Sequence, residues 1–247
     1  MIARRWSWIG AGVLLLADLF LHKPISDVCD AMVGRYGWRT FNHTALLVIS
    51  GASLGIAGAL LVWDWRRLRG PATAAALMIL SLLTYLMHRW MLVANVELIH
   101  YPQYALIAAV LLFGGNTWNV AWLGATGAGV IDEVYQELVI YAGRPDTYLD
   151  FNDMVLNAIG ATWAVLLLAR WAGRSAPTTP TQRRASAVVL LLGFALALWL
   201  DPPNWTAVFR VTKTGGVYHV MSAAEGLAAA LVLWLIARQG TAPANKS

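Results

Sequence analysis

Residues 132–137 read Asp-Glu-Val-Tyr-Gln-Glu, and residues 150–160 read Asp-Phe-Asn-Asp-Met-Val-Leu-Asn-Ala-Ile-Gly. Apolar runs surround both stretches, so acidic and amide side chains stand inside segments that otherwise have the composition of membrane helices. An ionisable side chain at membrane depth is costly when it faces lipid, and it therefore turns toward a bundle interior or a water-filled cavity. The two stretches predict two polar helix faces that meet inside a membrane protein.

The spacing of these polar residues supports that prediction. In the first stretch they recur every three or four positions, which places them on one arc of a helix. They are Asp132, Glu133, Gln136 and Glu137. Asp153 and Asn157 are likewise four residues apart, and Gly160 continues their face. Because small residues let membrane helices approach closely, we expect the two helices to pack against each other through these faces.

The composition of the whole chain is that of a membrane protein. Of its 247 residues, 59% are hydrophobic and only 13% are charged, which excludes an ordinary soluble domain. The net charge is +5, but the basic residues are scattered over short connections, so no nucleic-acid partner is expected. Cys29 is the only cysteine, which excludes an intrachain disulfide and a cysteine-based zinc site. No motif for a soluble cofactor occurs, and we expect none.

The apolar runs predict an all-α, polytopic transmembrane bundle of about eight spans. They cover residues 6–21, 44–63, 72–93, 101–113, 118–141, 153–171, 185–200 and 218–237, with a loop expected between the first two. No small-residue cleavage site precedes His22, so the first run is predicted to be a retained helix rather than a signal peptide. The predicted parts are N-terminal helices at 1–94, a core at 95–172 and C-terminal helices at 173–247.

The distribution of basic residues predicts the orientation. When the helices alternate across the membrane, most Lys and Arg residues fall on the side of both termini, including Arg4-Arg5 and Arg66-Arg67. This bias favours a multi-pass protein of the cell inner or plasma membrane with both termini in the cytoplasm. Glu133, Asp153 and the other unusual polar residues then gather near the outer leaflet.

Two parts of the chain resemble one known family. Residues 96–104, Val-Glu-Leu-Ile-His-Tyr-Pro-Gln-Tyr, resemble the histidine-then-tyrosine helix of the VanZ-like membrane proteins. Residues 133–136, Arg144 and residues 153–160 resemble the glutamate, glutamine, arginine and Asp-x-x-x-Asn pattern of that family. The match covers about residues 95–172. The family takes its name from teicoplanin resistance, so the resemblance implies a role in the cell envelope, linked to resistance against glycopeptide antibiotics.

Two features depart from the family pattern. Glu97 stands where the family has a basic residue before the histidine. The connection from Arg144 to Asp153 is longer than in the family, and it adds Asp146 and Asp150. Both departures bear on which substrate the protein takes.

One interpretation is an intramembrane enzyme, or a binding protein, for a lipid-linked or amphipathic ligand at the outer leaflet. Glu133 and Asp153, desolvated beside other carboxylates, suit general acid or base chemistry, and His100 is the alternative base. Arg144 would hold a phosphate or carboxylate of the ligand. The candidate ligand-binding residues are Gln136, Arg144, Asn157, Tyr104 and Glu137.

A second interpretation is a non-enzymatic binding or assembly subunit of a membrane complex, with a membrane protein as its partner. The acidic cluster then joins helices, with Glu133 or Asp153 paired to Arg144, while Gln136 and Asn157 bridge the two polar helices. The sequence leaves both interpretations open. A transporter is disfavoured because no internal repeat occurs.

The histidines are scattered along the chain. One alternative that the sequence leaves open is a cation at the outer face, held by carboxylates together with His100, His88, His219 or His22. No His-Glu-x-x-His motif and no closely spaced histidine pair is present, so no metal site is assigned.

Overall fold

The fold is a bundle of helices with one small β-hairpin. The computed structural model describes residues 2–64, 70–143, 148–173, 179–200, 208–211 and 217–241. Within these ranges the long helices are α1 (Ile2–Tyr36), α2 (Trp38–Trp63), α4 (Pro71–Trp90), α5 (His100–Phe113), α6 (Trp118–Tyr135), α7 (Phe151–Leu168), α8 (Pro180–Leu200) and α9 (Ala223–Gly240). The short elements are a 3-10 helix η1 (Asn95–Ile99), a π-helix η2 (Gln136–Ile140) and the strands β1 (Val208–Val211) and β2 (Val217–Val220). The predicted all-α class is confirmed.

Five helical segments are long and apolar enough to cross a membrane. They are Ala3–Tyr36, Trp38–Trp63, Pro71–Trp90, Asn95–Phe113 and Phe151–Leu168. The large apolar side chains of Leu47, Leu54 and Val62 on α2 are exposed, which suits contact with lipid rather than with water. These helices indicate an integral membrane protein.

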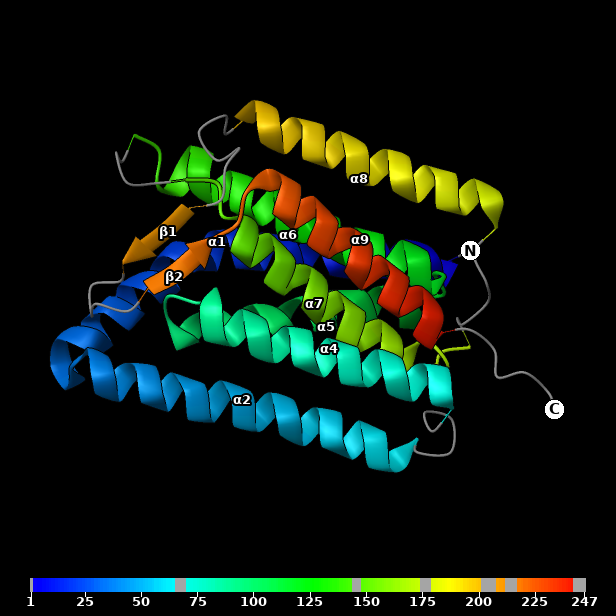
Figure 1. Cartoon of the computed structure of the whole chain (residues 1–247), viewed down its shortest axis with the longest axis horizontal. Helices are drawn as coiled ribbons and strands as arrows, with labels where there is room; N and C mark the ends of the chain where they lie inside the picture. The colour runs from blue at the N-terminus through cyan, green and yellow to red at the C-terminus, as the bar shows by residue number, and fades with distance from the viewer. Residues whose placement is uncertain are drawn as a thin grey trace.

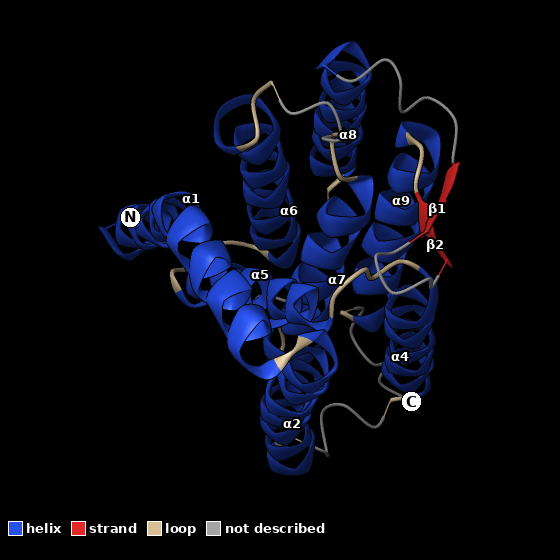
Figure 2. Ribbon diagram, turned by 90° about the vertical axis from the view of Figure 1, so that its left-hand side faces the viewer, coloured by secondary structure: helices blue, strands red, loops and turns tan. Residues whose placement is uncertain are grey.

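Helix α7 is the centre of the bundle. It packs against α4, α5, α6 and α9, whereas α1, α2 and α8 lie at the periphery (Figure 2). In its membrane-crossing window 89% of the residues are buried, so α7 has no face that is left for lipid. The few polar side chains of α7 therefore face other helices rather than lipid.

Glycines allow the closest helix contacts. A Cβ built on Gly160 of α7 would overlap the backbone oxygen of Tyr101 on α5. A Cβ built on Gly129 of α6 would lie 2.6 Å from the Cβ of Asn157 on α7. The polar faces of α6 and α7 therefore meet as the spacing of small residues predicts.

Successive long helices run in opposite directions along the bundle. The start of α1 and the end of α9 lie at one end, on the right of Figure 1. The starts of α5 and α7 and the end of α6 lie at the opposite end, together with the β-hairpin (Figure 1). We call this second end the site end, because the acidic residues of the core gather there.

The first helix is longer than predicted. The sequence indicated an end near residue 21 followed by a loop, whereas α1 continues through Pro24 to Tyr36. Proline removes one backbone donor, but its fixed φ is close to the helical value and the bonds on both sides hold the helix together. The expected loop shrinks to Gly37, whose φ of 82° makes the turn into α2.

The start of the last helix also differs from the prediction. Residues 217–220 form strand β2, which pairs antiparallel with β1, and α9 begins only at Ala223. The Ser222 hydroxyl accepts a hydrogen bond from the Glu225 backbone N–H, and the Glu225 carboxylate accepts one from the Ser222 backbone N–H. The Ser-x-x-Glu sequence of this capping box is the signal that fixes the boundary.

The contact between α5 and α7 predicts the effect of one methyl group. Gly160→Ala should lower the free energy of unfolding by about 1–3 kcal/mol, because the new Cβ has to push the two backbones apart. Gly127→Ala on α6 is the matched control, since a Cβ there meets nothing within 4 Å. Denaturant unfolding in detergent measures both. Equal stability of the two variants would contradict the close approach.

Candidate functional site

Local caps set the positions of the first turns at the site end. The Glu97 carboxylate accepts hydrogen bonds from the backbone N–H groups of Val93 and Ala94, at 2.9 and 3.0 Å, and so closes the turn that leads to His100. Asp150 caps α7 by accepting from the backbone N–H groups of Asn152 and Asp153, at 2.9 and 3.3 Å. Acidic residues are favourable at helix N-termini, so capping explains why both carboxylates stand at these positions.

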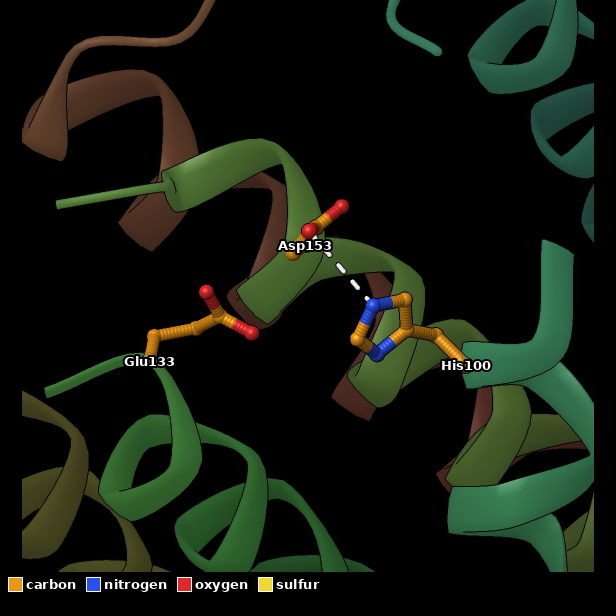
Figure 3. Close-up of side chains that lie close together, drawn as sticks. All are labelled: His100, Glu133 and Asp153. Atoms are coloured by element: carbon orange, nitrogen blue, oxygen red, sulfur yellow. Dashed lines mark ion pairs between the residues drawn. The ribbon is translucent and has the colours of Figure 1, made fainter. Parts of the chain in front are cut away.

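Three of the predicted residues converge. His100 Nε2 lies 3.5 Å from Asp153 Oδ2, and one donor atom each of His100, Glu133 and Asp153 lies within 4.8 Å of the other two. The side chains come from α5, α6 and α7 and face a common space (Figure 3). His100 and Glu133 are buried, while the side chain of Asp153 is 15% exposed. We call these three residues the triad.

A second group of polar residues, on α1, α5, α6 and η2, lies beside the triad. The Tyr104 hydroxyl lies 3.1 Å from Asp18 Oδ2 and 3.1 Å from Asp132 Oδ2. It carries one hydrogen, so it donates to one carboxylate and accepts from the other only when that carboxyl is protonated. Gln136 Nε2 donates to Asp132 Oδ2 at 3.2 Å and to Glu133 Oε1 at 3.3 Å. Gln136 thereby orients the Glu133 carboxylate.

Acidic groups outnumber their cationic partners at this end. The neighbourhood contains Asp18, Glu97, Asp132, Glu133, Asp150 and Asp153. In the part of the chain that the structure describes, no Lys or Arg forms an ion pair with any of them, whereas His100 pairs with Asp153. Burial and the nearby Asp153 carboxylate raise the pKa of Asp150 to about 7, against the effect of its two backbone donors. Asp150 is therefore only partly ionised near neutral pH.

The amide residues do not join α6 to α7 by hydrogen bonds. Both hydrogen bonds that the Gln136 amide group donates go to α6, the helix that directly precedes η2. Asn157 is fully buried, and neither its Oδ1 nor its Nδ2 has a hydrogen-bond partner among the described residues. The hydrogen bond that does link the two helices runs from Trp122 Nε1 to Thr162 Oγ1, at 2.8 Å. The proposed ion pair with Arg144 lies outside the described residues.

Tyr104 and Glu137 take positions that differ from each other. Tyr104 is completely buried, and its hydroxyl bridges two carboxylates. It therefore stabilises the surroundings of the triad from inside the bundle. Glu137 is half-buried on η2, one residue beyond Gln136. Of the other histidines, His219 pairs with Glu225 at 3.1 Å, and His22 contacts the Tyr141 hydroxyl at 3.2 Å.

Sequence reasoning did not assign three residues that hold the site together. Asn152 donates to the backbone oxygens of Met91 and His219 and accepts from the backbone N–H of Met221. Asp18 and Asp150 complete the acidic neighbourhood. Signals for two of them exist in the sequence: Asp18 is an ionisable residue inside an apolar run, and Asp150 stands at a helix start. Nothing local indicates the role of Asn152.

A separate cavity opens at the site end. Its volume is about 720 Å³, and it lies between residues 38–44 at the start of α2 and Asn95 of η1. Asn42 Oδ1 accepts from the Asn95 backbone N–H at 2.6 Å, which ties the cavity wall to the turn that precedes His100. Arg39 and His43 line the cavity and give it a basic wall.

Comparisons with known proteins add no family. Searches of protein-family models, of curated proteins and of solved structures found no match to this chain. The VanZ-like resemblance of residues 95–172 therefore stays a prediction that depends on the residues themselves.

The hydroxyl of Tyr104 predicts a stability effect. Tyr104→Phe should lower the free energy of unfolding by about 1–3 kcal/mol, because two carboxylates lose the group that they share. Tyr85→Phe is the control, since Tyr85 is 60% exposed on α4. Thermal unfolding in detergent compares the two variants with the wild type. A Tyr104→Phe protein as stable as Tyr85→Phe would show that the carboxylates do not depend on this hydroxyl.

Proposed function

We propose that the protein is a VanZ-like integral membrane protein of the cell envelope that binds an amphipathic or lipid-linked ligand at the outer leaflet. The observation that carries the proposal is the triad: His100, Glu133 and Asp153 converge from three helices at one end of the bundle. Groups of this kind, buried together in a membrane protein, are expensive and generally functional.

The proposed topology has eight spans and cytoplasmic termini. Helices α6, α8 and α9 have 18, 21 and 18 residues, close to the roughly 20 that a span needs. Arg4 and Arg238 belong to the end opposite the site, where α1 starts and α9 ends. The rule that basic residues stay on the cytoplasmic side then supports an outward-facing site.

A ligand explains the triad better than helix joining does. Paired or bridging groups stabilise a membrane bundle when each finds its partner, but a surplus of buried carboxylates without cations is destabilising. Asn157 is a buried amide without a partner, beside the triad in the packing of α6 against α7. A buried amide without a partner is destabilising, so its presence beside buried carboxylates favours a ligand-binding role over a purely structural one.

The charges constrain what the ligand brings. An excess of carboxylates repels a bare phosphate and favours an amine or a cation that accompanies the phosphate. The basic wall at Arg39 and His43 suits the anionic part of an amphipathic molecule. We therefore infer that the ligand lies across the site end, with a positive charge at the triad that belongs to the ligand or to a cation that accompanies it.

The triad also suits proton transfer. His100 Nε2 and Asp153 Oδ2, 3.5 Å apart, form a histidine–carboxylate pair in which the carboxylate stabilises the protonated imidazole. His100 then acts as the base, and Glu133, oriented by Gln136, acts as the acid. A turnover reaction on the ligand uses both residues, whereas simple binding needs only the charge.

Charge-removing variants test this proposal. Glu133→Gln and Asp153→Asn should each weaken ligand binding at least about tenfold, because each removes a buried charge that the ligand satisfies. The measurements are the lipids that copurify with the protein, identified by native mass spectrometry, and growth of an expressing host under a teicoplanin-type lipoglycopeptide. Membrane lipid profiles report turnover.

Asp27→Asn is the matched control, because Asp27 is exposed and pairs with Lys23 on α1. Thermal stability is recorded for every variant. Loss of copurifying lipid or of resistance with unchanged stability supports the ligand site. If both variants behave like Asp27→Asn, or lose stability without any change in lipid or resistance, the cluster is structural and the protein is better described as an assembly subunit.

A further inference from the structure

We propose that His100, Glu133 and Asp153 bind a divalent transition-metal cation of the Zn²⁺ or Mn²⁺ class. This goes beyond the proposed function, and it depends on side-chain geometry alone. The three residues contribute one imidazole nitrogen and two carboxylate oxygens, a donor set that suits these metals more than Ca²⁺ or Mg²⁺, which prefer oxygen only.

The spacing of the donor atoms fits a metal better than a hydrogen bond. The 3.5 Å between His100 Nε2 and Asp153 Oδ2 is long for a hydrogen bond. Two ligands of a tetrahedral ion with bonds of about 2.1 Å stand roughly 3.4 Å apart, which matches this distance. Glu133 completes three ligands within 4.8 Å, and a small rotation of its flexible side chain shortens the remaining gap.

Asn157 supplies an independent observation beside the triad. It follows Asp153 by one helical turn on α7, and it packs against Gly129, one turn before Glu133 on α6. Side chains on a helix lean toward its N-terminus, so the Asn157 amide leans toward Asp153. The amide is fully buried and both its polar atoms lack partners. The proposal gives this amide a partner, because its oxygen can bind the metal directly or through a bound water.

The surroundings favour a cation with two charges. Asp18, Asp132 and Asp150 add negative charge around the triad, and a divalent ion offsets it within a low-dielectric interior. Gln136 Nε2 donates to Glu133 Oε1, which leaves the other carboxylate oxygen for the metal. Such outer hydrogen bonds orient metal ligands and are a regular part of metal sites.

A metal also reconciles the acidic cluster with an anionic ligand. A bound dication presents open positions to a phosphate or carboxylate oxygen, because three protein ligands leave the coordination sphere incomplete. It polarises that oxygen as a Lewis acid, and it takes the place of proton transfer by His100 and Glu133, whose donor atoms it occupies. The proposed lipid-linked ligand therefore needs no arginine at the triad itself.

The test uses the full-length protein, purified in detergent through a tag without histidines and treated with EDTA. Zn²⁺, Mn²⁺, Mg²⁺ and Ca²⁺ are titrated separately while thermal unfolding is recorded. About one equivalent of Zn²⁺ or Mn²⁺ should stay bound through gel filtration, measured by inductively coupled plasma mass spectrometry, and should raise Tm. His100→Gln, Glu133→Gln and Asp153→Asn should each weaken binding at least about tenfold.

Asp27→Asn is again the control, since it removes an exposed carboxylate that pairs with Lys23. Wild-type protein with Co²⁺ provides a readout that needs no variant: visible absorption bands that Zn²⁺ abolishes are expected for a site of this kind. Absence of bound metal and of these bands overturns the proposal, as does equal metal binding by all three triad variants. Metal binding without an effect on lipid or resistance leaves the metal site standing and removes the proposed function.

Discussion

The close approach of α7 to α5 and α6 is the constraint on which the rest of the structure depends. Gly160 brings the α7 backbone against the Tyr101 carbonyl, and Gly129 admits Asn157 between α6 and α7. Once these contacts fix three helices, the first turn of α7, the first turn of α5 and the last turn of α6 must meet at one end. His100, Glu133 and Asp153 therefore converge as a consequence of packing in the middle of the bundle.

The convergence has an energetic cost that shapes its surroundings. Each buried carboxylate loses water. The described residues offer these carboxylates backbone N–H groups at helix starts, one tyrosine hydroxyl, one glutamine amide and the His100 imidazole, but no Lys or Arg. Glu97 and Asp150 are satisfied because they end helices, so their charges have a structural explanation. Glu133 and Asp153 do not cap a helix, which is why the proposed function depends on them and on His100.

Much of this was accessible from the sequence, and the reason differs for each part. Apolar runs predict the helices because length and composition are local properties. The spacing of Gly160 and Asn157 indicates that polar faces meet through small residues. The predicted end of α1 was wrong because Pro24 is a strong local signal for a helix break, whereas the helix continues through it. The predicted start of α9 was wrong because the apolar stretch extends before the Ser222 capping box, which sets the true start of the helix.

The sequence names His100, Glu133 and Asp153 as candidates, but it does not indicate how close together they lie. His100 precedes Glu133 by 33 positions and Asp153 by 53, so no spacing rule for metal motifs applies to them. Motifs such as His-Glu-x-x-His place the metal ligands on one helix, where the 3.6-residue periodicity sets the distances between their side chains. When each ligand comes from a different helix, the distances depend on how the helices cross, and that depends on Gly129 and Gly160. The glycines have no reactive side chains, but they set how closely the helices pack and therefore how close the polar side chains lie to one another.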